Sequence, residues 1–234
     1  MAGKVKSGGS WFTVLLVIAA VAIWAYEQKP PAQKSGSPRV SQVEKSPTPP
    51  ASKSTTTVRK TGRYEVYENC VLAEARNNDG DSFRVRLPDG RTEEIRLYFV
   101  DTPESAFKRY SGGETNHPRI RQQAADLGGI TPEQAVEIGK KAKAFTLALL
   151  ATKPFTIFTE WDSPYSDQRY HAHIEVTHDG KTRWLHQLLV ERGLARIKTK
   201  ASDLPDGTSA AKEKAVLQNL ERNAKRIQTG VWGL

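Results

Sequence analysis

The sequence predicts an α+β domain, a small β-barrel with helices, preceded by an apolar segment and a polar linker. Three observations predict this organisation. Short segments from about Arg63 onward alternate apolar and polar residues with the period of a strand. One long helical pattern interrupts them, and two more follow near the C-terminus. An uncharged run and a Pro- and Ser-rich stretch precede the whole.

The N-terminal region predicts a short tail at residues 1–10 and a transmembrane helix at residues 11–26, a run without any charged side chain. A spanning helix needs roughly 17–25 residues, so this run is at the short end and can be extended by Gly8 to Ser10. Aromatic residues stand at both ends, where the membrane interface favours them. The alternative is a cleaved signal peptide, because Ala20-Val21-Ala22 has the small-x-small form of a cleavage site.

Residues 27–62 are rich in Pro, Ser, Thr, Lys and Gln and predict a disordered linker. Residues 1–60 contain nine Lys or Arg and two Glu, so they account for +7 of the total net charge of +9. The charge therefore gives little support for nucleic-acid binding by the domain. By lysine count, the positive-inside rule places the domain in the cytoplasm. The short tail before an apolar run resembles an export signal, so we expect an extracytoplasmic domain, secreted if the segment is cleaved.

The domain is predicted to span residues 63–234. Alternation predicts strands at residues 64–74, 82–87, 92–100, 155–160 and 170–177, with a short run after the turn at 178–181. Thr131-Pro132-Glu133-Gln134 predicts the start of a helix that ends before Pro154. Helical patterns follow at residues 184–192 and 209–227. Cys70 is expected to be a small buried strand residue rather than a reactive thiol.

Acidic residues gather at two predicted strand boundaries. Asp79-Gly80-Asp81 opens the strand at 82–87, where an ordinary turn is the simpler interpretation. The strand carrying Arg96 ends in Asp101-Thr102-Pro103-Glu104, and Pro103 favours an extended Thr102. Asp101, the Thr102 carbonyl and Glu104 should then lie near one strand end, a set of oxygens that suits calcium. A strand end with solvated acids is the alternative.

Together these segments resemble the staphylococcal nuclease, or thermonuclease, family. The resemblance rests on Asp79-Gly80-Asp81-Ser82, on Arg96 to Glu104 with the sequence RLYFVDTPE, and on Asp167-Gln168-Arg169. It covers residues 63–234, and Gly139 to Thr146 and Leu188 to Ala195 also resemble helices of the family.

The resemblance implies a five-stranded OB-type β-barrel with about three helices. It implies a Ca²⁺ site at Asp81, Asp101 and the Thr102 carbonyl, with Glu104 acting on the attacking water. Arg96 and Arg169 would hold the phosphate. The implied activity is calcium-dependent endonucleolytic hydrolysis of DNA or RNA, giving 3′-phosphorylated ends.

The sequence departs from the family at several positions. Residues 105–138 are longer than the corresponding loop. The segment before Arg169 lacks the family's lysine-tyrosine-glycine pattern, so Tyr165 is the candidate for a substrate-binding tyrosine. Thr199 stands where the family has an aromatic residue, which predicts weaker or different base stacking.

Three alternatives remain. A zinc site can be drawn from His171 and His173 with His178 and His186, although ordinary barrel-surface histidines are the simpler interpretation. Residues 107–110, with Arg119 and Arg121, are candidates for backbone contacts to nucleic acid or for a solvated loop. The whole domain is alternatively a noncatalytic OB-fold module that binds nucleic acid or protein at the cell envelope.

Overall fold

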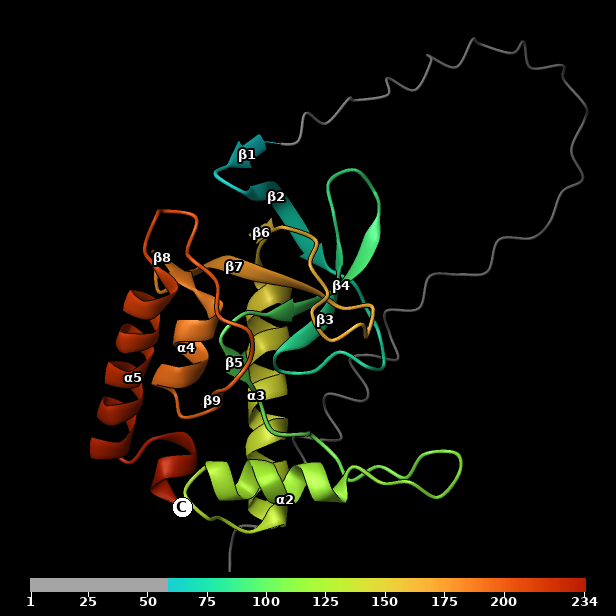
Figure 1. Ribbon diagram of the computed structural model, residues 1–234, viewed down its shortest axis with the longest axis vertical. Coiled ribbons are helices and arrows are strands. Elements are labelled where there is room, and N and C mark those ends of the chain that lie inside the picture. Colours follow the sequence, from blue (N-terminus) through green and yellow to red (C-terminus); the bar gives the residue numbers. More distant parts are fainter. Residues whose placement is uncertain (1–58) are drawn as a thin grey trace, which may run out of the picture. The chain divides into compact units, whose positions relative to one another are not determined.

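The computed structural model describes residues 59–234 (Figure 1). The predicted tail at 1–10, the predicted anchor at 11–26 and the predicted linker up to residue 58 lie outside the described residues. Within residues 59–234, no helix is both long and apolar enough to cross a membrane.

A closed five-stranded barrel forms the centre of the described part, as predicted. Its strands pair in the order β2-β3-β4-β7-β6, and β6 returns to pair with β2. The neighbours are antiparallel except for β4 and β7, which are parallel. The bounds are β2 (Tyr64–Leu72), β3 (Ser82–Arg86), β4 (Thr92–Leu97), β6 (Phe155–Thr159) and β7 (Tyr170–His178).

Four short strands extend this arrangement. β1 (Arg59–Thr61) pairs with β2 and falls on the last residues of the predicted linker, and β8 (Lys181–Trp184) pairs with β7. β5 (Val100–Asp101) pairs with β9 (Arg196–Ile197) in a separate two-stranded sheet. The prediction of one continuous strand at 92–100 was wrong, because Phe99 adopts a φ of 70° and separates β4 from β5.

Four helices surround the barrel in the described part, where about three were expected. They are α2 (His117–Asp126), α3 (Pro132–Thr152), α4 (Leu185–Glu191) and α5 (Ala210–Arg226), and a 3-10 turn, η1 (Gly230–Gly233), follows. The additional helix, α2, lies in the inserted segment 105–138 and crosses the lower end of α3 (Figure 1). Helix α3 begins with the predicted capping box, in which Thr131 and Gln134 each accept from the other's backbone N–H.

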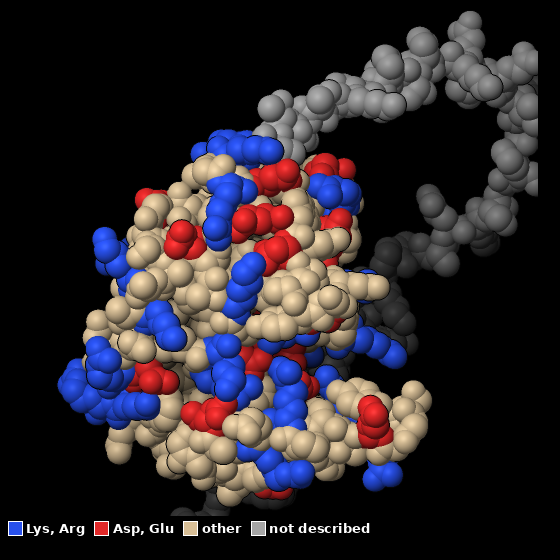
Figure 2. Space-filling model, viewed as in Figure 1, with Lys and Arg blue, Asp and Glu red and all other residues tan. Residues whose placement is uncertain are grey.

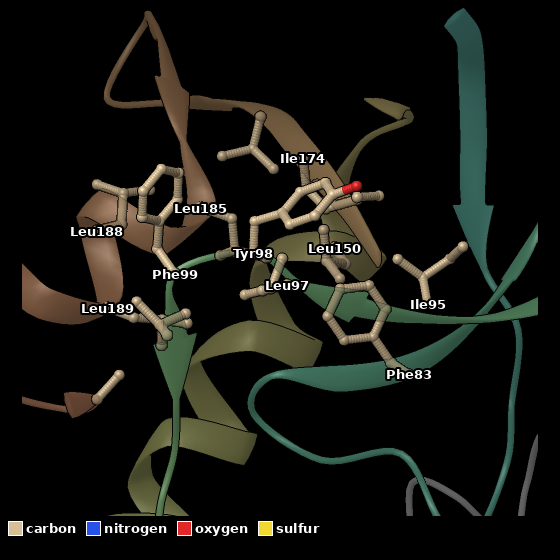
Figure 3. Packing of buried hydrophobic residues seen from close by; sticks show 14 of the residues in the cluster. Phe83, Ile95, Leu97, Tyr98, Phe99, Leu150, Ile174, Leu185, Leu188 and Leu189 are labelled. Carbon is tan, nitrogen blue, oxygen red and sulfur yellow. The ribbon is translucent and has the colours of Figure 1, made fainter. Parts of the chain in front are cut away.

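The core fills the barrel and the space between it and the helices. Phe83, Ile95 and Leu97 from the strands lie near Leu150 of α3 and residues of α4 (Figure 3). Cys70 is fully buried in β2, as predicted. Between two of the helices, the buried His186 Nε2 of α4 hydrogen-bonds Glu213 Oε1 of α5 at 2.8 Å. The site residues lie where β4, β5 and the turn before β3 leave this core.

Candidate active site

Asp101 lies at the centre of the charged residues. Its position follows from the left-handed Phe99, which turns the chain from β4 into β5, where Asp101 pairs with Arg196 of β9. Arg96 Nη2 donates to Asp101 Oδ1 at 2.7 Å, and Arg196 Nη2 lies 2.7 Å from Asp101 Oδ2. Arg119 of α2 adds a third cation, 2.8 Å from Asp101 Oδ1. One buried carboxylate therefore faces three guanidinium groups.

Asp81 lies beside this cluster, on the turn that precedes β3. Its Oδ2 accepts the Thr102 backbone N–H at 3.2 Å and lies 3.2 Å from Arg96 Nη2. Gly80 makes this close approach possible, since a Cβ there would lie 2.9 Å from two side-chain atoms of Thr102. Thr146 of α3 fixes the same turn by donating to the Gly80 carbonyl at 2.8 Å.

Glu104 is held between α2 and α3. Its backbone N–H donates to the Gln123 side chain at 3.0 Å, and its carboxylate lies 3.0 Å from Arg119 Nε. On the other side, α3 approaches the Pro103 and Glu104 carbonyls so closely at Gly139 that a Cβ would overlap them. The position of Glu104 thus depends on both helices.

The two buried aspartates differ in their electrostatic surroundings. Burial raises the pKa of Asp81 to about 6, with Asp101 adding to the rise and Arg96 opposing it. Burial alone would also raise the pKa of Asp101, but Arg119, Arg196 and a hydrogen bond from Gln123 bring it below its ordinary value. Asp101 is therefore the more acidic member of the pair, and Asp81 is the first of the two to take up a proton as the pH falls.

An open cleft of about 430 Å³ runs along this cluster. Five of its lining residues are basic and two are acidic, a net charge of +3. The lining residues are Arg96, Asp101, Arg119, Tyr165, Asp167, Arg169, Arg196, Lys198 and Thr199. Figure 2 shows basic and acidic side chains lying close together on the face above α2. An excess of guanidinium groups in a recess suits an anion such as phosphate.

The arginines of the cleft differ in their access to solvent. The Arg96 side chain is only 5% exposed, whereas those of Arg169 and Arg119 are 27% and 46% exposed. Arg96 Nε is buried and has no hydrogen-bond partner within residues 59–234. Arg169 Nε donates to Asp167 at 3.0 Å, and its Nη1 donates to Ser82 Oγ at 3.2 Å. An incoming anion meets Arg119 and Arg169 first.

The predicted site residues lie in one region of the structure, and they form two groups. Arg96, Asp101, Arg169 and Tyr165 line the cleft, with Tyr165 half exposed. Asp81, Thr102 and Glu104 join them through ion pairs and hydrogen bonds and do not line the cleft.

Gln123, Arg196 and Lys198 were not predicted as site residues, and Arg119 was predicted either to contact nucleic-acid backbone or to lie in a solvated loop. Pro118 at a first helical turn and the four-residue spacing of Arg119 and Gln123 are the signals that point to one helix face. No local signal identifies Arg196, because its partner Asp101 is 95 residues away in the chain.

Two of the oxygens expected to hold calcium, those of Asp101 and Thr102, are of the kind that such an ion binds. Gln123 Nε2 donates to both Asp101 Oδ2 and the Thr102 carbonyl, at 3.0 Å each, so these two oxygens face a common point. Carboxylate and carbonyl oxygens are the ligands calcium prefers. A bound cation would compete with the Gln123 amide for them.

The histidines are arranged differently from the zinc alternative. Within residues 59–234, no group of three or more His, Cys, Asp or Glu side chains could hold a metal ion. His171, His173 and His186 are fully buried, so the expectation of barrel-surface histidines was wrong for these three. His171 and His173 on β7 face inward because α4 and the segment after β9 cover that side of the strand, and His173 Nε2 lies 3.0 Å from the Asp203 carbonyl.

A closed small barrel with a cationic cleft beside clustered carboxylates is typical of proteins that bind or act on nucleic acids. Residues 94–233 match the family model described as staphylococcal nuclease homologue, and the chain belongs to this family. No curated protein is a match. Among solved structures, the extended Tudor domain of Drosophila melanogaster Tudor-SN (p100) is similar at 12% identity and a TM-score of 0.36, over 94% of this chain and 87% of that one.

Proposed function

We propose that the protein is an endonuclease that hydrolyses phosphodiester bonds of DNA, RNA or both in a calcium-dependent reaction. The observation that carries the proposal is the cleft with a net charge of +3 that runs beside buried Asp81 and Asp101 and partly buried Glu104. A binding surface needs the cations alone. The additional carboxylates provide for metal binding and for activation of water.

The phosphate is held by guanidinium groups in this proposal. Arg169, whose side chain is 27% exposed, lines the cleft. Arg96 is more buried, and its unpartnered Nε is a donor for charge that grows on the phosphate. Tyr165, exposed at the rim, provides a ring on which a base can stack.

Glu104 orients or deprotonates the attacking water. Its carboxylate is fixed by Arg119 and by Asn116 Nδ2 at 3.3 Å, so it is oriented before substrate arrives. Asp81, Asp101 and the Thr102 carbonyl hold the calcium ion. When bound, calcium supplies positive charge that stabilises the phosphate oxygens.

The same proposal includes a membrane tether. The uncharged residues 11–26 serve as the anchor, and the linker, which begins at residue 27 and ends before β1 at Arg59, carries the nuclease domain. We place the domain outside the cytoplasm, where a nonspecific nuclease does not endanger the cell, and expect a secreted form if the segment is cleaved. A reporter fused after Leu234 tests this, and reporter activity in the cytoplasm contradicts it.

Calcium-dependent cleavage is tested with the full chain purified in mild detergent, so that the apolar segment stays in solution. A single-stranded DNA and a single-stranded RNA are incubated with calcium, and then with calcium and excess chelator. We expect cleavage only without chelator. No calcium-dependent cleavage of either substrate between neutral and alkaline pH contradicts the proposal.

A noncatalytic binding module is the second candidate. One observation favours it: both oxygens of Asp101 and the Thr102 carbonyl already accept hydrogen bonds from side chains. It predicts that Glu104→Gln leaves the biological role intact. Loss of cleavage in that variant, with folding and oligonucleotide binding preserved, rejects the binding module.

A further inference from the structure

Helix α2, which the inserted segment adds beside the site, is firmly fixed on one face. Ile120 and Ala124 are buried against Ala135 and Val136 of α3. Residues three and four positions apart share a helix face, so packing through Ile120 and Ala124 fixes the direction in which the rest of α2 points. The adjacent side of the helix, which carries Arg119 and Gln123, faces the segment from Asp101 to Glu104.

The Gln123 side chain connects α2 to that segment. This side chain is fully buried. The side-chain Nε2 donates to Asp101 Oδ2 and to the Thr102 carbonyl, and the side-chain Oε1 accepts the Glu104 backbone N–H. Three hydrogen bonds therefore join one side chain to three successive functional positions. Arg119, one turn earlier, is carried to a defined place at the cleft.

Arg119 is the third arginine beside Asp101 and the most exposed of the three. Asp101 is already paired with Arg96 and Arg196, whose side chains are 5% and 10% exposed. Arg119 reaches Asp101 Oδ1 and Glu104 Oε1 from the solvent side, and 46% of its side chain remains exposed. Asp101 has two buried cations without Arg119, and the exposed part of the Arg119 guanidinium is available to a ligand.

We propose that Arg119 is a third phosphate-binding arginine of the cleft, which holds a single-stranded polynucleotide together with Arg169. This inference rests on the proposed function in so far as the ligand is a nucleic acid. The two arginines line the same recess, and their planar groups can each donate two hydrogen bonds to a phosphate. The insertion thereby gives the site a cation that the family resemblance does not imply.

Binding is measured with a fluorescent single-stranded DNA oligonucleotide and the full chain in detergent, with excess chelator so that the substrate stays intact. The variants are Arg119→Ala, Arg119→Lys and the matched control Arg121→Ala. Arg121 is an exposed arginine on the same helix and does not line the cleft. Each Kd is determined at several salt concentrations, and a melting temperature verifies folding.

We expect Arg119→Ala to weaken binding by about ten- to a hundredfold, the range for a hydrogen bond to a charged group. Loss of one phosphate contact should reduce the slope of log K against log salt by about 0.7. Arg119→Lys should keep the wild-type slope with intermediate affinity. Arg121→Ala should change neither by much. A purely structural Arg119 can lower the melting temperature, but it does not produce this salt slope or this rescue by lysine.

The outcomes separate this inference from the proposed function. Equal affinity and salt slope in Arg119→Ala and Arg121→Ala overturn the inference, whether or not the wild type cleaves. Absence of oligonucleotide binding by the wild type also overturns it. A wild type that binds through Arg119 but does not cleave with calcium supports the inference and rejects the nuclease.

Discussion

Replacement of Gly139 by alanine should have two opposing effects, a gain in helix propensity and a steric overlap beside the site. Gly139 lies inside α3, where alanine is favoured over glycine by about 1 kcal/mol. Here, however, an added Cβ would lie 2.5 Å from the Pro103 carbonyl oxygen and closer still to that of Glu104, whereas ordinary contact begins at 3.4 Å. The overlap is therefore about 1 Å, and both obstacles are backbone atoms that cannot rotate away.

Overpacking of this kind costs about 1–3 kcal/mol, so the net loss in the free energy of unfolding should be about 0–2 kcal/mol. Activity should fall further. If the Pro103-Glu104 backbone moves by most of the overlap, the Glu104 carboxylate moves with it, and a 1 Å misplacement can cost about a hundredfold in rate. Gly139→Ala should thus lose far more activity than stability.

Urea unfolding followed by tryptophan fluorescence gives the stability, and single-turnover cleavage gives the rate. Lys141→Ala is the matched control, because Lys141 is exposed on the same helix and alanine changes its helix propensity little. A Gly139→Ala protein that is about 1 kcal/mol more stable and fully active would show that α3 does not constrain Glu104.

Three further predictions concern single side chains. Burial raises the pKa of Cys70 to about 12, so a thiol reagent should modify it only in urea; reaction in the folded protein contradicts this. Burial lowers the pKa of His171 from 6.5 to about 4, so the unfolded chain binds the extra proton between these values and stability is lost as pH falls through them. His171→Phe should therefore lose less free energy of unfolding than the wild type between pH 7 and pH 4.5, as measured by urea unfolding. An equal loss in the two proteins shows that His171 is not the cause. Asp167→Asn removes the ion-pair partner of Arg169 and should tighten oligonucleotide binding up to about fivefold, the range of a partly exposed pair, whereas weaker binding contradicts it.

The sequence predicted the barrel well because its signals are local. Alternating residues marked the main strands, and the capping box at Thr131 marked the start of α3. The break at Phe99 escaped prediction, since a left-handed backbone at a large aromatic residue is imposed by the surrounding fold. The split into β4 and β5 matters because it turns Asp101 toward Arg196.

The candidate site was predictable only in part. Asp81, Asp101 and Glu104 stood out because two short motifs contain them. Helix α2 was missed because it is short and polar, with few apolar residues on its buried face. Its contacts to Asp101 span 18 and 22 residues of chain, and no periodicity in the sequence shows where such a segment folds back.

The proposed nuclease depends most on the carboxylate of Glu104, which acts on water beside the cleft. The most direct test is the single-turnover cleavage rate of Glu104→Gln with saturating calcium, alongside its oligonucleotide affinity and melting temperature. Removal of a general base should lower the rate by about 10²- to 10⁴-fold while binding and folding remain near wild type. A wild-type cleavage rate in Glu104→Gln contradicts a catalytic role of this carboxylate.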